Sequence, residues 1–146
     1  MASANTMLCL PASLDSLEKL SNELYDFVKP FSLDPALVYQ LDLASSEAFT
    51  NIVRHAVNYD DTQNVIITMD LDGHRLILTL SDPGLAIPDD ILRQWLQPPD
   101  LTPDPLNQAS WPEGGMGLIL IQSVMDRVLY ETVNGCNQLT LIKDLA

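Results

Sequence analysis

The stretch SSEAFTNIVRHAV, residues 45–57, places an acid and an amide four residues apart in an otherwise apolar, helix-like run. Glu47 and Asn51 stand at i and i+4, so they project side by side from one edge of the predicted helix. Helix interiors mildly disfavour Asn. A solvated Glu beside a hydrogen-bonding Asn also accounts for the pair taken alone. The apolar face of this helix comprises Leu41, Ala44, Ala48, Phe49, Ile52 and Ala56.

Helix signals flank this stretch on its N-terminal side. Asp34 is an N-cap followed by Pro35 at the first helical position, so the helix begins there and can run to about Val57. An earlier helix is predicted after the N-cap Ser13, because apolar residues recur at helical spacing until Pro30 ends the pattern. Residues 117–125 also read as a helix.

Short apolar runs predict five strands, with Asp72-Gly73 and Asn134-Gly135 as the turns of two hairpins. The predicted strands are residues 7–10, 65–71, 76–80, 128–133 and 138–142. The order of elements predicts an α+β fold, a two-layer sandwich with helices on one face of a mixed, mostly antiparallel sheet.

Composition limits the classes of partner. Hydrophobic residues make up 47% of the 146 residues, so we expect one domain over residues 1–146. The formal charge of −13 would repel nucleic acid and an anionic membrane, and favours a metal ion or a protein with a basic patch. The longest apolar run is too short to cross a bilayer and the N-terminus lacks a signal-peptide pattern. We therefore expect a soluble, cytoplasmic protein.

Two isolated cysteines, Cys9 and Cys136, form neither a CxxC pair nor a dense framework. Structural buried thiols are expected in preference to a disulfide or a metal site.

A proline-rich segment interrupts the regular pattern. Six of the ten prolines lie between Pro88 and Pro112. Proline fixes φ and removes a backbone donor, so this segment resists helix and strand. Such a long irregular segment is either disordered or functional, and we expect a lid at about residues 88–113.

Two further motifs flank the lid. The strand at 76–80 leads into Asp82-Pro83-Gly84, a carboxylate at a strand end followed by a residue that permits close approach to the backbone. The same letters are common in plain turns. After the lid, residues 113–117 read EGGMG and lead into an apolar helix, whose free N–H groups suit phosphate oxygens.

The chain carries, in this order, an ExxxN motif on a helix, DPG after a strand, a long lid and GGMG before a helix. This series resembles the N, G1 and G2 boxes of the GHKL superfamily of Bergerat-fold, histidine-kinase-like ATPases. Within it the chain is similar to the bacterial anti-sigma factor serine/threonine kinases. The resemblance covers nearly the whole chain and implies a protein kinase that uses Mg²⁺ and ATP, phosphorylates an anti-sigma factor antagonist and sequesters a sigma factor. It also suggests a homodimer.

The resemblance assigns roles to individual residues. Glu47 matches the catalytic acid that orients or deprotonates the attacking hydroxyl, and Asn51 matches the Mg²⁺ ligand. Asp82 matches the carboxylate that accepts from the adenine amino group, and Gly84 the glycine beneath the base. Gly115 and Gly117 match the loop that approaches the triphosphate, and Gly114 matches the hinge of the lid.

Cations that could contact phosphate are scarce. With seven Lys and Arg in the chain, the candidates are Arg93, in the lid, and Arg54, one turn past Asn51. For Arg54, a solvated helix arginine is the simpler interpretation.

The sequence also departs from the family pattern. The second glycine of the G1 box is replaced by Ala86, and the lid carries several acids. The lid could then serve as a docking segment with Trp95 and Trp111 as anchors. Two alternatives therefore stay open: a partner-binding regulator with a weak or silent nucleotide site, and a detached histidine-kinase catalytic domain. Glu47 argues against the latter, since those kinases commonly have Asn there.

Overall fold

The computed structural model of the chain describes residues 3–86 and 121–145. The strands are β1 (Ser3–Pro11), β2 (Asn64–Asp72), β3 (Arg75–Asp82), β4 (Arg127–Val133) and β5 (Cys136–Asp144), and the long helices are α1 (Leu17–Val28) and α2 (Pro35–Asn51). Short 3-10 turns, Leu14–Ser16 and Lys29–Phe31, flank α1, and a π-helical turn, Ile52–Ala56, follows α2. Residues 121–124 are helical.

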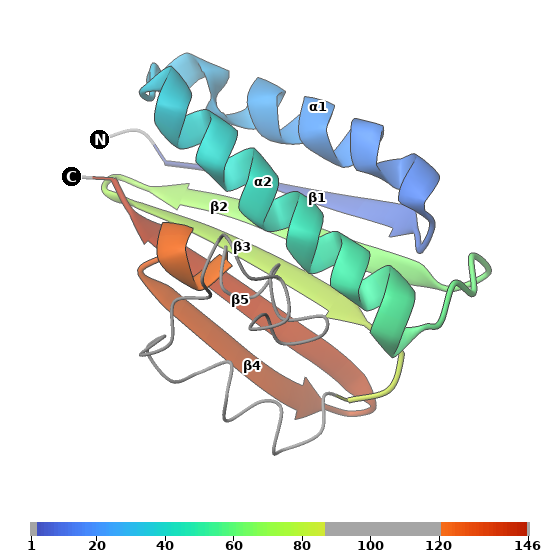
Figure 1. Cartoon of the computed structure of the whole chain (residues 1–146). Coiled ribbons are helices and arrows are strands. Elements are labelled where there is room, and N and C mark those ends of the chain that lie inside the picture. The colour runs from blue at the N-terminus through green and yellow to red at the C-terminus, as the bar shows by residue number, and fades with distance from the viewer. Residues whose placement is uncertain (1–2, 87–120, 146) are drawn as a thin grey trace, which may run out of the picture.

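The strands form one sheet in the order β1-β2-β3-β5-β4. Each neighbouring pair is antiparallel, so the described sheet has no parallel pair, where a mixed sheet was predicted. Figure 1 shows α1 and α2 on the same face of this sheet, beside each other above β1, β2 and β3. The predicted two-layer α+β sandwich is confirmed.

Both predicted N-caps are present. The hydroxyl of Ser13 accepts from the backbone N–H of Asp15 at 3.2 Å. The carboxylate of Asp34 accepts from the N–H of Ala36 at 2.9 Å, with Pro35 at the first helical position. These contacts satisfy N–H groups that have no partner inside a helix.

The second helix does not stay α-helical to Val57 as predicted. The α-helix ends at Asn51, and the N–H of Val57 then donates to the carbonyl of Ile52 at 3.1 Å, five residues back. This π turn keeps Ile52 and Val53 buried. The apolar spacing of residues 52–57 therefore predicts a buried helical turn but cannot distinguish a π turn from an α turn.

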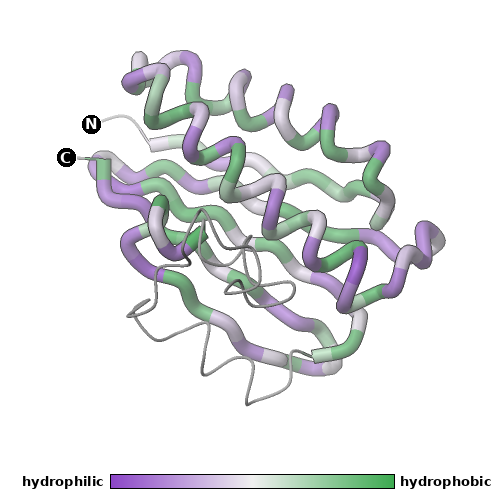
Figure 2. The backbone as a smooth tube through the Cα atoms, viewed as in Figure 1, coloured by the Kyte–Doolittle hydropathy of each residue, from purple (hydrophilic) through white to green (hydrophobic). Residues whose placement is uncertain are grey.

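The core lies between the helices and the sheet. Figure 2 shows hydrophilic residues on the turns of α1 that point away from the sheet. The largest fully buried side chains are Phe49, Leu20, Leu24, Leu41, Ile67, Met69, Leu76, Leu78, Leu80, Ile121, Leu141 and Val53. Within the described part of the chain, no helix has the length and apolar character needed to cross a membrane.

The predicted burial of the cysteines is wrong. Cys9 and Cys136 are both free and both exposed. Side chains alternate across a strand, and the neighbours Leu10 and Asn137 take the inward positions. The two thiols therefore point to the sheet face that α1 and α2 leave uncovered.

Truncation of a buried aromatic on α2 should destabilise the fold far more than truncation of an exposed one. Phe49 is completely buried, whereas Tyr39, on the same helix, is 58% exposed. Phe49→Ala should lower the free energy of unfolding by about 3–5 kcal/mol through lost burial and a residual cavity. Tyr39→Ala should change it by less than about 0.5 kcal/mol. Urea denaturation of both variants measures the difference, and equal effects would contradict this assignment of the core.

Candidate functional site

The C-terminal half of α2 carries the predicted acid and amide one helical turn apart. Glu47 and Asn51 are both half-buried, and the Glu47 carboxylate makes no hydrogen bond or ion pair with any described residue. The side-chain nitrogen of Asn51 is buried and has no hydrogen-bond partner among the residues described. A buried amide without a partner is rare in folded proteins and calls for a ligand or water. Asn51 therefore fits an oxygen-rich ligand such as a metal-bound phosphate.

The π turn at the end of α2 contacts the turn that follows β3. The N–H of Leu85 donates to the carbonyl of Ala56 at 2.8 Å. A Cβ placed on Gly84 would lie 2.3 Å from the same carbonyl oxygen, a distance that no real Cβ contact shows. Glycine is therefore required at position 84 because the helix backbone passes there. The resemblance had implied only a role beneath the base.

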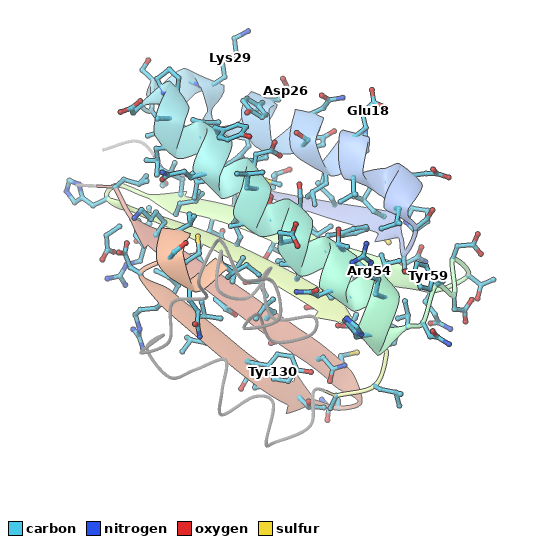
Figure 3. The ribbon with its side chains drawn as sticks, viewed as in Figure 1. Glu18, Asp26, Lys29, Arg54, Tyr59 and Tyr130 are labelled. Carbon is cyan, nitrogen blue, oxygen red and sulfur yellow. The ribbon has the colours of Figure 1, made fainter. Side chains whose placement is uncertain are left out.

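The chain leaves the π turn through an unusual backbone conformation. Asn58 and Tyr59 both have positive φ, 50° and 63°, which non-glycine residues rarely adopt. The N–H of Tyr59 donates to the carbonyl of Val53 at 2.7 Å. Figure 3 shows Arg54 and Tyr59 at this C-terminal end of α2. Arg54 is exposed and makes no ion pair with a described residue, so its predicted phosphate contact remains a prediction.

At the end of β3, a buried carboxylate is held by two donors. Asp82 is 4% exposed. Its Oδ1 accepts from the N–H of Gly84 at 2.8 Å and from the side-chain nitrogen of Asn137 at 3.1 Å. The Oδ2 atom accepts no hydrogen bond from the described part of the chain. One oxygen of Asp82 is thus engaged by the protein and the other is available to a ligand.

Burial controls the ionisation of this group. Desolvation raises the pKa of the Asp82 carboxyl above its ordinary value, and the hydrogen bonds from Asn137 and Gly84 oppose that rise. The charged form is therefore less favourable in the folded protein than in the unfolded chain.

The structure brings some of the predicted site residues together. Gly84 contacts the turn that follows Asn51, which joins the Asp82 turn to the end of α2. Ala86 is exposed at the end of that turn. Arg93, Gly114, Gly115 and Gly117 lie outside the described residues, as do the predicted lid and its two tryptophans.

Sequence reasoning missed Asn137. The turn at Asn134-Gly135 and the inward positions of Leu139 and Leu141 imply by alternation that residue 137 also points inward. A polar residue at an inward position was the available signal.

Substitution at Gly84 should disrupt the contact between the two elements. Gly84→Ala should lower the free energy of unfolding by about 2 kcal/mol or more, because the backbone of Ala56 cannot move as a flexible side chain would. Leu85→Ala removes a side chain that is 76% exposed and serves as the neighbouring control, with a change below about 0.5 kcal/mol. Thermal or urea unfolding measures both variants. Equal stabilities of the two variants would show that the close approach is absent.

Neutralising Asp82 should stabilise the protein near neutral pH. Because its folded pKa is raised, the ionised group lowers stability at pH values above that pKa, and this cost disappears below the ordinary carboxyl pKa of about 3.9. Asp82→Asn should therefore raise the melting temperature near pH 7, by an amount that shrinks on acidification.

Asp60 is the matched control, because the pKa of its carboxyl is lowered whereas that of Asp82 is raised. Hydrogen bonds from Thr62 lower the pKa of the Asp60 carboxyl, so Asp60→Asn should reduce stability near neutral pH. Scanning calorimetry at several pH values compares the two variants. A melting temperature of Asp82→Asn that falls at pH 7 by as much as that of Asp60→Asn would contradict the expected cost of burying Asp82.

Comparison with known proteins extends these observations. A sequence profile of the family described as "Histidine kinase-like ATPase domain" matches residues 10–143. The chain is 34% identical over 100 residues to a protein named serine-protein kinase RsbW from Bacillus velezensis, which covers 67% of this chain and 59% of that one. It is 32% identical over 116 residues to an anti-sigma F factor from Anoxybacillus flavithermus, which covers 77% of this chain and 75% of that one.

Solved structures share the fold at low sequence identity. The RsbU and RsbW domains of Rv1364c from Mycobacterium tuberculosis match with a TM-score of 0.66 at 14% identity, over 97% of this chain and 32% of that one. The SiaB–SiaC complex from Pseudomonas aeruginosa matches with a TM-score of 0.65 at 17% identity, over 94% of this chain and 88% of that one. The profile match spans most of the chain, and the motifs on α2 and after β3 lie within it, so the protein belongs to the histidine kinase-like ATPase domain family.

Proposed function

We propose that the chain is a protein serine/threonine kinase that uses Mg²⁺ and ATP, phosphorylates an anti-sigma factor antagonist and sequesters a sigma factor. The observation that carries the proposal is the buried Asp82 carboxylate, whose Oδ2 is unoccupied by described residues while Oδ1 is held by two donors. An acceptor of this kind suits the exocyclic amine of adenine. The relatives named RsbW kinase and anti-sigma F factor support the choice of reaction.

The acid and amide on α2 have complementary roles in this proposal. Asn51 would supply an amide oxygen to Mg²⁺, and its buried nitrogen, which has no hydrogen-bond partner among the described residues, is consistent with a site built for phosphate oxygens. Bound Mg²⁺ supplies neutralisation of charge on the phosphates. Glu47 orients or deprotonates the serine or threonine hydroxyl of the partner, and its lack of a partner among the described residues leaves it free to do so.

The remaining assignments follow the motif order. Gly115 and Gly117 approach the triphosphate, Gly114 is the hinge of the lid, and Arg93 and Arg54 are the cations that could contact the phosphates. The predicted lid, residues 88–113, lies outside the described residues. These roles are assigned from the family resemblance alone.

The partners and location form the last part of the proposal. A formal charge of −13 favours a protein partner with a basic surface over nucleic acid or an anionic membrane. The chain works in the cytoplasm, as a homodimer. It spans 59% of the length of the Bacillus velezensis RsbW that it matches, so the activity of that whole protein comes to this chain as a proposal.

A second candidate is a partner-binding regulator whose nucleotide site is weak or silent. The observation that favours it is Ala86, which stands exposed where the family motif has a glycine that passes the nucleotide. This regulator would hold its partner equally well with and without ATP.

Calorimetric titration with ATP, with and without Mg²⁺, separates the two candidates. The kinase proposal predicts Mg²⁺-dependent binding that Asn51→Ala weakens by about tenfold or more, the loss expected for one ligand or charged hydrogen bond. Folded wild-type protein that binds no ATP at millimolar concentration would support the silent regulator instead.

Phosphate transfer tests the role of Glu47. Glu47→Gln should reduce transfer from γ-labelled ATP to a purified anti-sigma factor antagonist by about 100-fold or more, with ATP affinity unchanged. Glu18→Gln changes an exposed acid on α1 and serves as the control with wild-type transfer. Transfer by Glu47→Gln at the wild-type rate would remove Glu47 from the mechanism.

A further inference from the structure

Three polar residues form one row across the sheet beside the proposed nucleotide site. In the strand register Asp82 on β3 lies opposite Asn137 on β5, and Asn137 lies opposite Thr132 on β4. Directly paired residues of antiparallel strands place their side chains on the same face. Asn137 is the middle member and is 1% exposed.

The surroundings of Asn137 determine the orientation of its amide. Its nitrogen lies 3.1 Å from Asp82 Oδ1, 3.0 Å from the carbonyl of Gly84 and 3.2 Å from the carbonyl of Leu85. Its oxygen accepts from the hydroxyl of Thr132 at 2.9 Å. A flipped amide would bring an oxygen against a carboxylate and two carbonyls, so only the observed orientation is compatible with these neighbours.

This arrangement leaves the two oxygens of Asp82 in different environments. Oδ1 receives both the Asn137 nitrogen and the Gly84 N–H. No described residue donates to Oδ2, which leaves that oxygen to accept from a base. An unshared acceptor attracts the amino group of adenine and repels the carbonyl oxygen that guanine carries at the same ring position.

Given the proposed ATP binding, we propose that Asn137 is a positioning residue for base selection: it occupies Oδ1 of Asp82, fixes the turn at Gly84 and Leu85, and is itself oriented by Thr132. The residue acts through Asp82 and does not itself touch the phosphates. The tip of the β4–β5 hairpin thereby becomes part of the determinant that distinguishes ATP from GTP.

The first test needs no nucleotide. NMR titration of the Asp82 carboxyl carbon should show a higher pKa in Asn137→Ala than in the wild type, because the hydrogen bond from Asn137 opposes the effect of burial. An unchanged Asp82 titration in folded Asn137→Ala would overturn the inference, whatever the protein binds.

The second test measures base discrimination as the ratio of GTP to ATP dissociation constants. Asn137→Ala should reduce this ratio by about tenfold, the value of one hydrogen bond to a charged group. Asn137→Asp, which sets a second carboxylate against Asp82, should reduce it further. Gln138→Ala alters the next side chain on β5, also an amide, which points to the opposite sheet face, and should leave the ratio unchanged.

Two substitutions at Thr132, one without and one with a hydroxyl, test the role of this residue. Thr132→Val removes the hydroxyl at nearly constant shape and should lower the ratio, whereas Thr132→Ser keeps the hydroxyl and should restore it. Equal losses of ATP and GTP affinity in Asn137→Ala, with the ratio kept within twofold, would show a purely structural role and overturn the inference. Wild-type protein that binds neither nucleotide, together with a raised Asp82 pKa in Asn137→Ala, would overturn base selection and the proposed function but leave the hydrogen bond itself established.

Discussion

The contact between the Ala56 carbonyl and Gly84 is the constraint on which the arrangement of the site depends. It fixes the end of α2 against the end of β3, with no space for a side chain at position 84 and a hydrogen bond from Leu85 to the same oxygen. Asn51 and Glu47 lie one and two turns back along that helix, and Asp82 lies two residues before the glycine. The relative placement of the acid, the amide and the carboxylate is therefore set by backbone packing rather than by flexible side chains.

The π turn makes this contact geometrically distinct from an ordinary helix end. Ala56 is the last residue of this π turn and its carbonyl contacts the turn after Asp82, and the chain then passes through two left-handed residues, Asn58 and Tyr59. Such backbone conformations cost free energy, about 1–3 kcal/mol each, and persist where the surroundings determine them. Here the N–H of Tyr59 donates to the carbonyl of Val53, a buried residue of the π turn.

Local signals in the sequence predicted most of the fold, and both ambiguous local patterns and long-range contacts account for what was missed. Asp34-Pro35 and the two hairpin turns have fixed local chemistry, so the elements beside them were correct within a few residues. The π turn was missed because its apolar spacing resembles that of an α-helix. Asn137 was missed because its importance depends on the pairing of β5 with β3, which no local pattern specifies. The predicted burial of the cysteines was wrong because it was inferred from cysteine spacing and redox compartment, without regard to strand alternation. The motifs singled out Glu47, Asn51 and Asp82, whose roles stay predictions, but only the packed backbone explains why position 84 needs glycine.

The hydrogen-bonded row Asp82, Asn137 and Thr132 can form only late in the folding of the described domain. Asp82 and Asn137 are 55 residues apart in the chain, so their hydrogen bond closes a long loop. The entropic cost of closing this loop is offset only when β5 pairs with β3. During synthesis the chain emerges from its N-terminus, and β1, α1, α2, β2 and β3 are available before β5 exists. The carboxylate of Asp82 therefore has no amide partner until β5 has been synthesised, and the nascent chain cannot complete this part of its site any earlier.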